Sequence, residues 1–132
     1  AVIKKYESQN VPKYLEEIGT YLLKQLNQLI NSENLGDIFW TSGHPTWIFL
    51  HIKEQKEYFS FEIQTFFLQE MFKRGILTLG SHNLSFSHTK EDIDRLMKVY
   101  AEVLPMIKHH INNKDLLENI QGEILKPLFK VR

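Results

Sequence analysis

The chain has 132 residues, the size of one ordinary domain, and its 16 basic and 16 acidic residues give a net charge of zero. A neutral chain argues against nucleic-acid binding, because that affinity comes mostly from neutralising phosphates with a basic surface. No apolar run approaches the roughly 20 residues that a membrane-spanning helix needs, so we expect no membrane partner. The absence of cysteine excludes disulfides, thiolate catalysis and sulfur-ligated zinc, and it fits a cytoplasmic location.

The first predicted elements are helical. Residues 1–9 resemble the end of a helix whose beginning is missing, and the chain does not begin with Met. We therefore expect a piece of a longer protein. In a second helix, Asn10 can cap the start and Pro12 suits the first turn. Its apolar stripe recurs every three or four residues, at Leu15, Ile18, Leu22, Leu26 and Leu29.

The middle of the chain predicts a hairpin and then a buried helix. Residues 37–41 and 46–52 are rich in aromatic and β-branched residues, which favours two antiparallel strands. Ser60 is the expected cap of the next helix, which is apolar around much of its circumference through Phe72. A helix of that kind is covered on more than one side. Gly75 is a suitable residue to end it.

The last third predicts two short strands and a long helix. The strands are expected at residues 76–79 and 84–87. Thr89 and Asp92 have the spacing of a capping box at the start of the helix. Pro105 is expected to kink or end that helix. A further short helix is predicted within residues 113–125, followed by a loose basic tail.

This order of elements predicts an α+β fold, with a small, mostly antiparallel sheet of three or four strands covered by three or four helices. The predicted strands are nearly all apolar, whereas a sheet with one wet face alternates apolar and polar residues. We therefore expect both faces of the sheet to be covered, one of them by a surface from elsewhere.

No complete catalytic constellation is visible. The six histidines lack metal-ligand spacing, so no metal site is predicted, although metal analysis would test a metal-dependent hydrolase. Ser85, His88 and Asp92 lie close together, but no nucleophile elbow accompanies them, and Asp92 is better explained as a cap. The dispersed glycines form no phosphate-binding loop.

Three stretches, in order, resemble the C-terminal segment of class III aminotransferases, which are pyridoxal-phosphate enzymes. Residues 2–29 are similar to a family segment with a helix, a break and a helix reading L-x-x-x-G-x-x-L, here Leu15 to Leu22 around Gly19. Residues 67–77 (FLQEMFKRGIL) are similar to F-x-x-x-[ML]-x-x-R-G-[VI]-x. Residues 84–99 (LSFSHTKEDIDRLMKV) contain S-H-T-x-E-D-I-D, the most specific of the three. The nearest resemblance is to the branch that contains glutamate-1-semialdehyde 2,1-aminomutase.

The resemblance implies that residues 1–108 are the small C-terminal domain of such an enzyme and that residues 109–132 extend beyond it. The parent would transfer or shift an amino group on an amino acid or amino-sugar-type substrate. The cofactor lysine and most phosphate contacts belong to the preceding large domain. This chain alone would therefore bind no pyridoxal phosphate and would be inactive. Its expected partners are that large domain of the same chain and, as a homodimer, a second copy.

By the same resemblance, the loop formed by Gly80, Ser81, His82 and Asn83 would face the active-site entrance. Many aminotransferases hold a substrate carboxylate with an arginine of the small domain, and this loop contains none. Ser81, His82 and Asn83 would instead offer neutral hydrogen bonds to a substrate. The alternative is an ordinary surface loop.

The alternative to the aminotransferase hypothesis is a non-enzymatic function. The missing catalytic set and the many aromatic residues also fit an α+β interaction or dimerisation module. Its apolar helix, residues 61–72, would then bind the partner.

Overall fold

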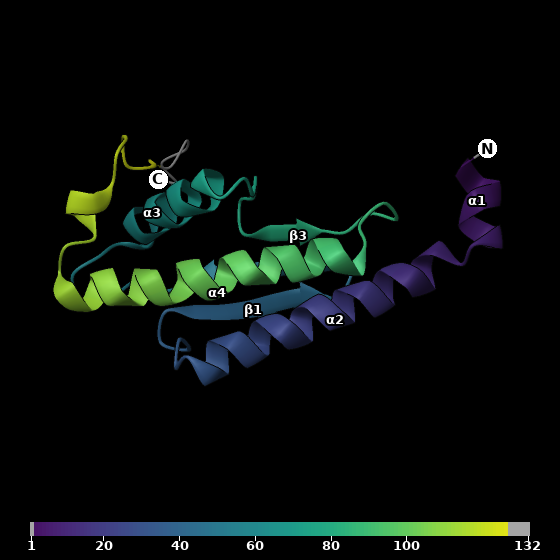
Figure 1. Cartoon of the computed structure of the whole chain (residues 1–132), viewed down its shortest axis with the longest axis horizontal. Coiled ribbons are helices and arrows are strands. Elements are labelled where there is room, and N and C mark those ends of the chain that lie inside the picture. Colours follow the sequence, from purple (N-terminus) through teal and green to yellow (C-terminus); the bar gives the residue numbers. More distant parts are fainter. Residues whose placement is uncertain (1, 127–132) are drawn as a thin grey trace, which may run out of the picture.

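The computed structural model describes residues 2–126, which form one helical layer against a small sheet (Figure 1). The elements in chain order are α1 (Val2–Ser8), α2 (Val11–Ser32), β1 (Phe39–His44), β2 (Trp47–Ile52), α3 (Ser60–Lys73), β3 (Ser81–Asn83), α4 (Lys90–Asn113) and the 3-10 turn η1 (Leu117–Asn119). The predicted α+β class, with a small antiparallel sheet, is confirmed.

The sheet has the order β1-β2-β3, and both pairs of strands are antiparallel. The hairpin β1–β2 pairs Phe39 with Ile52 and His44 with Trp47, so the two strands match over their full length. The short β3 covers only the first half of β2, because its register runs from Trp47 opposite Asn83 to Phe49 opposite Ser81. On the edge away from β1, the second half of β2 therefore has α3 beside it instead of a third strand.

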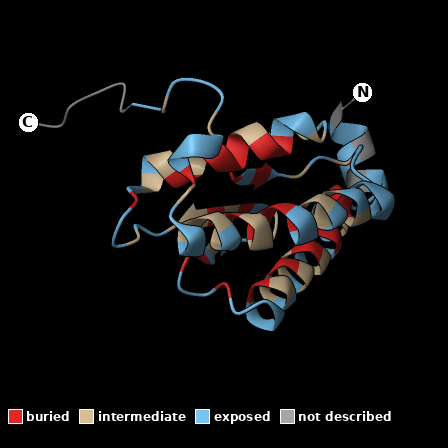
Figure 2. Ribbon diagram, turned by 60° about the vertical axis from the view of Figure 1, so that its left-hand side comes forward, coloured by how far each residue is buried: buried red, intermediate tan, exposed pale blue. Residues whose placement is uncertain are grey.

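The core lies between the sheet and the helices. Its largest fully buried side chains include Tyr100 of α4, Phe39 of β1 and Phe66 of α3. Figure 2 shows that the buried positions follow the sides of the helices and strands that face one another. Each such aromatic or aliphatic side chain stabilises the fold by about 1.5–3 kcal/mol. The apolar stripe predicted for the second helix is confirmed at Ile18, Leu22 and Leu26.

Two helix starts are set by local hydrogen bonds. The Asp92 carboxylate accepts from the Thr89 amide at 2.8 Å, and the Asp92 amide donates to the Thr89 hydroxyl at 3.3 Å, which confirms the predicted capping box. Helix α3 begins one residue earlier than expected, with Ser60 inside the helix and Phe59 as its cap. There the Phe59 amide donates to the Glu62 carboxylate at 2.8 Å.

The strands predicted at residues 76–79 and 84–87 are wrong, because the strand in this region is Ser81–Asn83 between them. The Leu50 amide donates to the Gly80 carbonyl at 2.7 Å, and the Leu84 amide donates to the Thr46 carbonyl at 3.3 Å. These contacts place the segment against β2 only between Gly80 and Leu84. Leu77 and Leu79, 90% and 71% exposed, gain no burial that would favour a strand.

The C-terminal part also differs from expectation. Pro105 neither ends nor splits α4, which continues to Asn113 with Leu104 and Ile107 fully buried around the proline. The boundary expected between residues 108 and 109 falls inside this helix. The helix predicted within 113–125 is reduced to η1, and Leu116 beside it is buried in the core. Most of the expected basic tail, residues 127–132, lies outside the described residues.

Candidate binding site on the open face of the sheet

The face of the sheet that points away from the helices is uncovered in the described part of the chain. Side chains alternate along strands, so one set points into the core and the next set points out. The outward positions are Trp40, Ser42 and His44 of β1, Trp47, Phe49 and His51 of β2, and Ser81 and Asn83 of β3. We call these eight residues the open sheet face. None of them carries a formal charge when histidine is neutral.

Aromatic rings run across the open sheet face. The Trp40 ring stacks on the His51 ring with centroids 4.0 Å apart and planes 16° apart. The Phe49 centroid lies 6.1 Å from His51 and 5.2 Å from Trp47. Trp40 and Trp47 are 45% and 54% exposed, which is unusual for the largest apolar side chains. Large exposed apolar patches are typical of contact sites, and these exposed rings make the open sheet face a candidate for one.

A hydrogen bond fixes the orientation of His51. Its Nε2 lies 2.6 Å from the Ser42 hydroxyl on the neighbouring strand. The ring is thus held between this bond and the stacked Trp40 indole. Such a pre-positioned polar and aromatic group costs little conformational entropy when it contacts a ligand.

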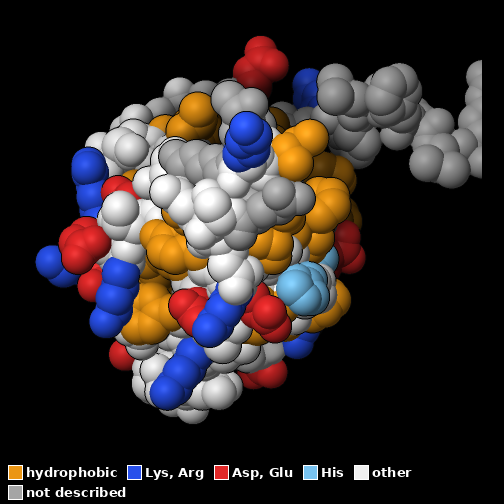
Figure 3. Space-filling model, turned by 90° about the vertical axis from the view of Figure 1, so that its right-hand side faces the viewer, with side chains coloured by type: hydrophobic (Ala, Val, Ile, Leu, Met, Phe, Trp, Pro, Cys, Tyr) orange, Lys and Arg blue, Asp and Glu red, His pale blue; other side chains and the backbone are white. Residues whose placement is uncertain are grey.

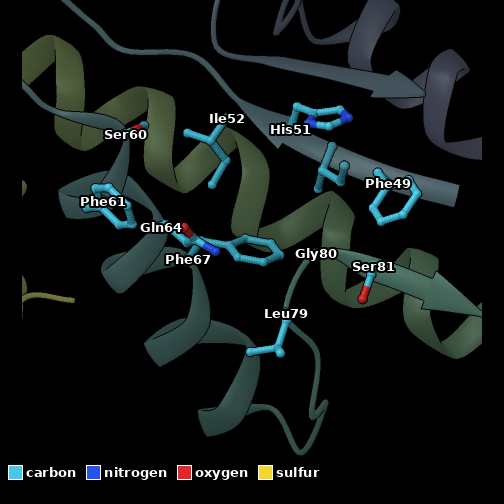
Figure 4. Close-up of a pocket in the computed structure, with 11 residues that line it drawn as sticks. Phe49, His51, Ile52, Ser60, Phe61, Gln64, Phe67, Leu79, Gly80 and Ser81 are labelled. Carbon is cyan, nitrogen blue, oxygen red and sulfur yellow. The ribbon is translucent and has the colours of Figure 1, made fainter. Parts of the chain in front are cut away.

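A pocket of about 430 Å³ lies between β2, the first turns of α3 and the segment that leads into β3 (Figure 4). We call it the β2–α3 pocket. Its lining residues are Phe49, Leu50, His51, Ile52, Ser60, Phe61, Gln64, Phe67, Leu79, Gly80 and Ser81. Its volume lies in the range of about 300–1,000 Å³ that is usual for small-molecule sites. It exists because β3 begins at Ser81, opposite Phe49, and leaves the edge of β2 that faces away from β1 without a strand beyond that point.

The four predicted loop residues do not form one exposed loop. Ser81, His82 and Asn83 are strand β3, in which Ser81 and Asn83 point outward and His82 points into the core. Ser81 and Gly80 line the β2–α3 pocket. His82 is only 6% exposed, and the small exposed part borders a separate hollow of about 310 Å³ that Ser81 and Asn83 also line.

His82 belongs to a buried hydrogen-bond network. Its Nδ1 lies 3.1 Å from the Ile48 carbonyl and its Nε2 lies 2.7 Å from the Tyr100 hydroxyl. A carbonyl only accepts, so Nδ1 carries the proton and Nε2 accepts from Tyr100. Burial lowers the pKa of His82, although the hydrogen bond to Ile48 acts in the opposite direction. His82 is thus a neutral link between β3, β2 and α4.

The sequence pointed to Gly80 and Ser81 but not to the other side chains that line the β2–α3 pocket. Gln64 and Ser60 come from α3, and His51 comes from β2 (Figure 4). These residues are far apart in the sequence and belong to no motif. The one available signal was the spacing of two along each strand, which places Trp40 and Ser42 on the same face.

None of the lysines whose exposure the structure describes is buried. A lysine that forms a Schiff base needs a desolvated setting that lowers its pKa. Lys108, the least exposed described lysine, donates to the carbonyls of Glu33 and Asn34, both at 3.0 Å. Among residues 2–126 no group of three or more histidine or acidic side chains is placed to hold a metal ion. Ser85 and His88 do meet, with Oγ 3.3 Å from Nδ1, but Asp92 bonds to Thr89 instead.

The charged side chains are of mixed sign at the end of the molecule that Figure 3 presents. There basic and acidic side chains lie among hydrophobic ones, without a large patch of one sign. Within the described helices, none combines the length and apolarity required to cross a bilayer.

We compared the chain with known protein families, curated proteins and solved structures. No family model, no curated protein and no solved structure matches the chain.

Proposed function

We propose that this chain is the C-terminal domain of a cytoplasmic pyridoxal-phosphate enzyme of the class III aminotransferase type. The parent would transfer an amino group or shift it within one molecule, as in the aminomutase branch that the sequence resembles. In this proposal the chain supplies no cofactor lysine. It supplies a wall that packs beside the active site of the preceding domain.

The observation that carries the proposal is the uncovered, uncharged aromatic face of the sheet. Helices protect one face, while Trp40 and Trp47 are left about half exposed on the other. The cores of protein interfaces are depleted in charged residues and enriched in aromatic ones. The open sheet face therefore has the composition of a surface that another domain covers.

The size of this face favours a covering domain in the same polypeptide. Strands of six residues span about 20 Å, and three strands span about 14 Å across the sheet. That patch is well below the roughly 800 Å² per partner that a stable complex buries. A tethered partner needs less area, because the linker supplies a high effective concentration. We accordingly assign homodimer formation to the whole parent protein.

Two of the stretches that resemble the family have clear structural roles in this fold. Arg74 and Gly75, within residues 67–77, lie directly after α3. Thr89 and Asp92, within residues 84–99, form the capping box of α4. These stretches set the ends of the two helices that pack on each other behind the sheet. This is the role expected of motifs in a domain that positions a site without holding the cofactor.

The encoding gene is the first test. We expect about 300 further codons upstream, a length set by usual domain sizes, that encode a lysine after a strand. An open reading frame that begins at this segment would overturn the proposal. It would favour the alternative of a non-catalytic α+β interaction module, which the same open sheet face supports.

A binding experiment is the second test. Pyridoxal phosphate is added to the 132-residue chain, which is then dialysed and examined for a visible aldimine absorption band. We expect no band to survive, and we expect one in the parent protein. A stable band from this chain alone would mean that it holds its own cofactor lysine, contrary to the proposal.

A further inference from the structure

We propose that the β2–α3 pocket binds an uncharged ligand, or the uncharged part of the parent's substrate, that has an apolar ring face and hydroxyl or amide groups. This inference rests on the proposed function for the identity of that substrate. It rests on the pocket alone for the chemistry of the ligand.

The first argument is the charge of the lining. None of the eleven residues that line the pocket is Lys, Arg, Asp or Glu, although 24% of the chain is of these four types. With His51 neutral, a carboxylate, phosphate or ammonium that entered would lose water without gaining an opposite charge, which is costly. The lining therefore selects against ions and in favour of a neutral ligand.

The second argument is the mixture of groups in the pocket. Phe49 and Phe61 present aromatic surface, and Figure 4 shows Phe67 at the base between them. Ser60, Gln64 and Ser81 add a hydroxyl, an amide and a second hydroxyl, all of which donate and accept hydrogen bonds without charge. Small-molecule sites combine apolar walls with a few such polar groups, which fix the orientation of the ligand. A neutral sugar ring or an amide-bearing ring matches both kinds of group.

The third argument is the rigidity of the pocket edge. The Gly80 carbonyl accepts from the Leu50 amide at 2.7 Å, and the Gly80 amide donates to the Thr78 hydroxyl at 3.1 Å. His82, one residue beyond Ser81, is anchored by Ile48 and Tyr100. Ser81 therefore projects from a backbone that is held on both sides, and a pre-formed site loses little entropy on binding.

The test uses the isotope-labelled 132-residue chain and backbone amide NMR. N-acetylglucosamine is titrated as the neutral probe, with glucose 6-phosphate as a charged probe of similar size and glutamate as a smaller charged probe. We expect saturable shifts for the neutral probe, confined to β2, the start of α3 and residues 79–81. Absence of saturable shifts with the neutral probe would overturn the inference, as would equal or stronger binding of either charged probe.

Two variants assign the site. Gln64→Leu removes the amide at nearly constant size, and we expect it to weaken binding of the neutral probe at least tenfold. Gln28→Leu on the exposed side of α2 is the control, and its binding should be unchanged. Amide spectra of both variants report whether the fold is intact. If Gln64→Leu folds and binds as well as the parent chain, the ligand lies elsewhere and the assignment is wrong.

The failure of this inference can be distinguished from the failure of the proposed function. An upstream pyridoxal-phosphate domain in the gene, together with a pocket that prefers charged probes, would refute the ligand class alone. A reading frame that begins at this segment, together with selective binding of the neutral probe, would refute the enzyme assignment alone.

Discussion

Gly19 of α2 touches the hairpin between β1 and β2 at Pro45. A Cβ atom placed on Gly19 would lie 1.9 Å from the Pro45 carbonyl oxygen and 2.5 Å from its carbonyl carbon. The helix can approach the turn this closely only because residue 19 has no side chain. This contact gives a physical reason for the glycine in the L-x-x-x-G-x-x-L pattern of α2, and it holds the hairpin against the helical layer.

Gly19→Ala is therefore expected to destabilise the fold, even though alanine is the better helix former by about 1 kcal/mol. Backbone atoms cannot move aside as a side-chain tip can, so we expect a net loss of about 1–3 kcal/mol. Urea unfolding measures the loss. Gly36→Ala is the matched control, because nothing lies within 4 Å of the Cβ it would add. Equal stability of the two variants would contradict the close packing of α2 on the hairpin.

The sequence predicted most accurately the features that depend only on residues nearby in the chain. The capping box of Thr89 and the apolar stripe through Leu22 depend on neighbours within one or two helical turns, and both are confirmed. The position of β3 depends on which residues reach the edge of β2, and no local signal contains that information. Pro105 was expected to kink or end the last long helix, but α4 continues through it because buried neighbours on both sides pack into the core.

The candidate site also combines features that depend on local sequence with features that depend on tertiary contacts. The sequence predicted the two strands of the hairpin, but they looked nearly all apolar, so the face shared by Trp40 and Phe49 became clear only from the strand register. The resemblance led to Gly80 and Ser81, which do line the pocket. Gln64 joins them only through the packing of α3 beside β2, which is a tertiary contact. His82 was expected at a loop, but the period of two along β3 turns it into the core.

Thr89→Ala should weaken the start of α4. It removes the hydroxyl that accepts from the Asp92 amide at 3.3 Å, and the loss of an N-cap typically costs about 0.5–2 kcal/mol. Unfolding in urea measures the change. Thr20→Ala, at an exposed position inside α2, is the control and should be neutral or slightly stabilising, because alanine favours helix. A loss at Thr20 as large as that at Thr89 would argue against a capping role.

Glu70 should contribute a pH-dependent part of the stability. Its carboxylate accepts from Lys73 and Arg74, both at 2.8 Å, and Arg74 also reaches Glu102 on α4 at 2.9 Å. Burial alone would raise the pKa of Glu70. Hydrogen bonds from Lys73, Gln69 and Arg74 and the charge of Lys73 outweigh it and lower that pKa from 4.5 to about 2. The carboxylate therefore stabilises the folded state above about pH 4.5, and this contribution is lost as the pH falls toward 2.

Glu70→Gln tests this ion-pair network. At neutral pH we expect a loss of about 1–3 kcal/mol in the free energy of unfolding, because Arg74 and Lys73 lose a buried acceptor. The difference from the parent chain should shrink as the pH falls from 4.5 toward 2. Glu17→Gln breaks an exposed pair with Lys13 at 3.8 Å and should cost at most about 0.5 kcal/mol. A difference at Glu70 that stays constant with pH would contradict an ionised carboxylate as its origin.

The His82–Tyr100 bond should control both stability and acid sensitivity. Burial raises the pKa of the Tyr100 hydroxyl, which stays protonated and donates to His82 Nε2 at 2.7 Å. Tyr100→Phe leaves that nitrogen buried without its donor and should cost about 1–3 kcal/mol. Tyr21→Phe is the control. It removes a bond to the half-buried Asp94, which water can replace, so a smaller loss is expected.

The pH dependence follows from the lowered pKa of His82. The unfolded chain takes up a proton near pH 6.5, whereas the folded chain resists it until a lower pH. The contribution of His82 is therefore complete above about pH 6.5, and stability falls as the pH drops below that value. Nitrogen-15 NMR of the imidazole should show a neutral ring with its proton on Nδ1 at pH 6.5. A ring that titrates in the folded chain at or above pH 6.5 would contradict the buried, neutral link between β3 and α4.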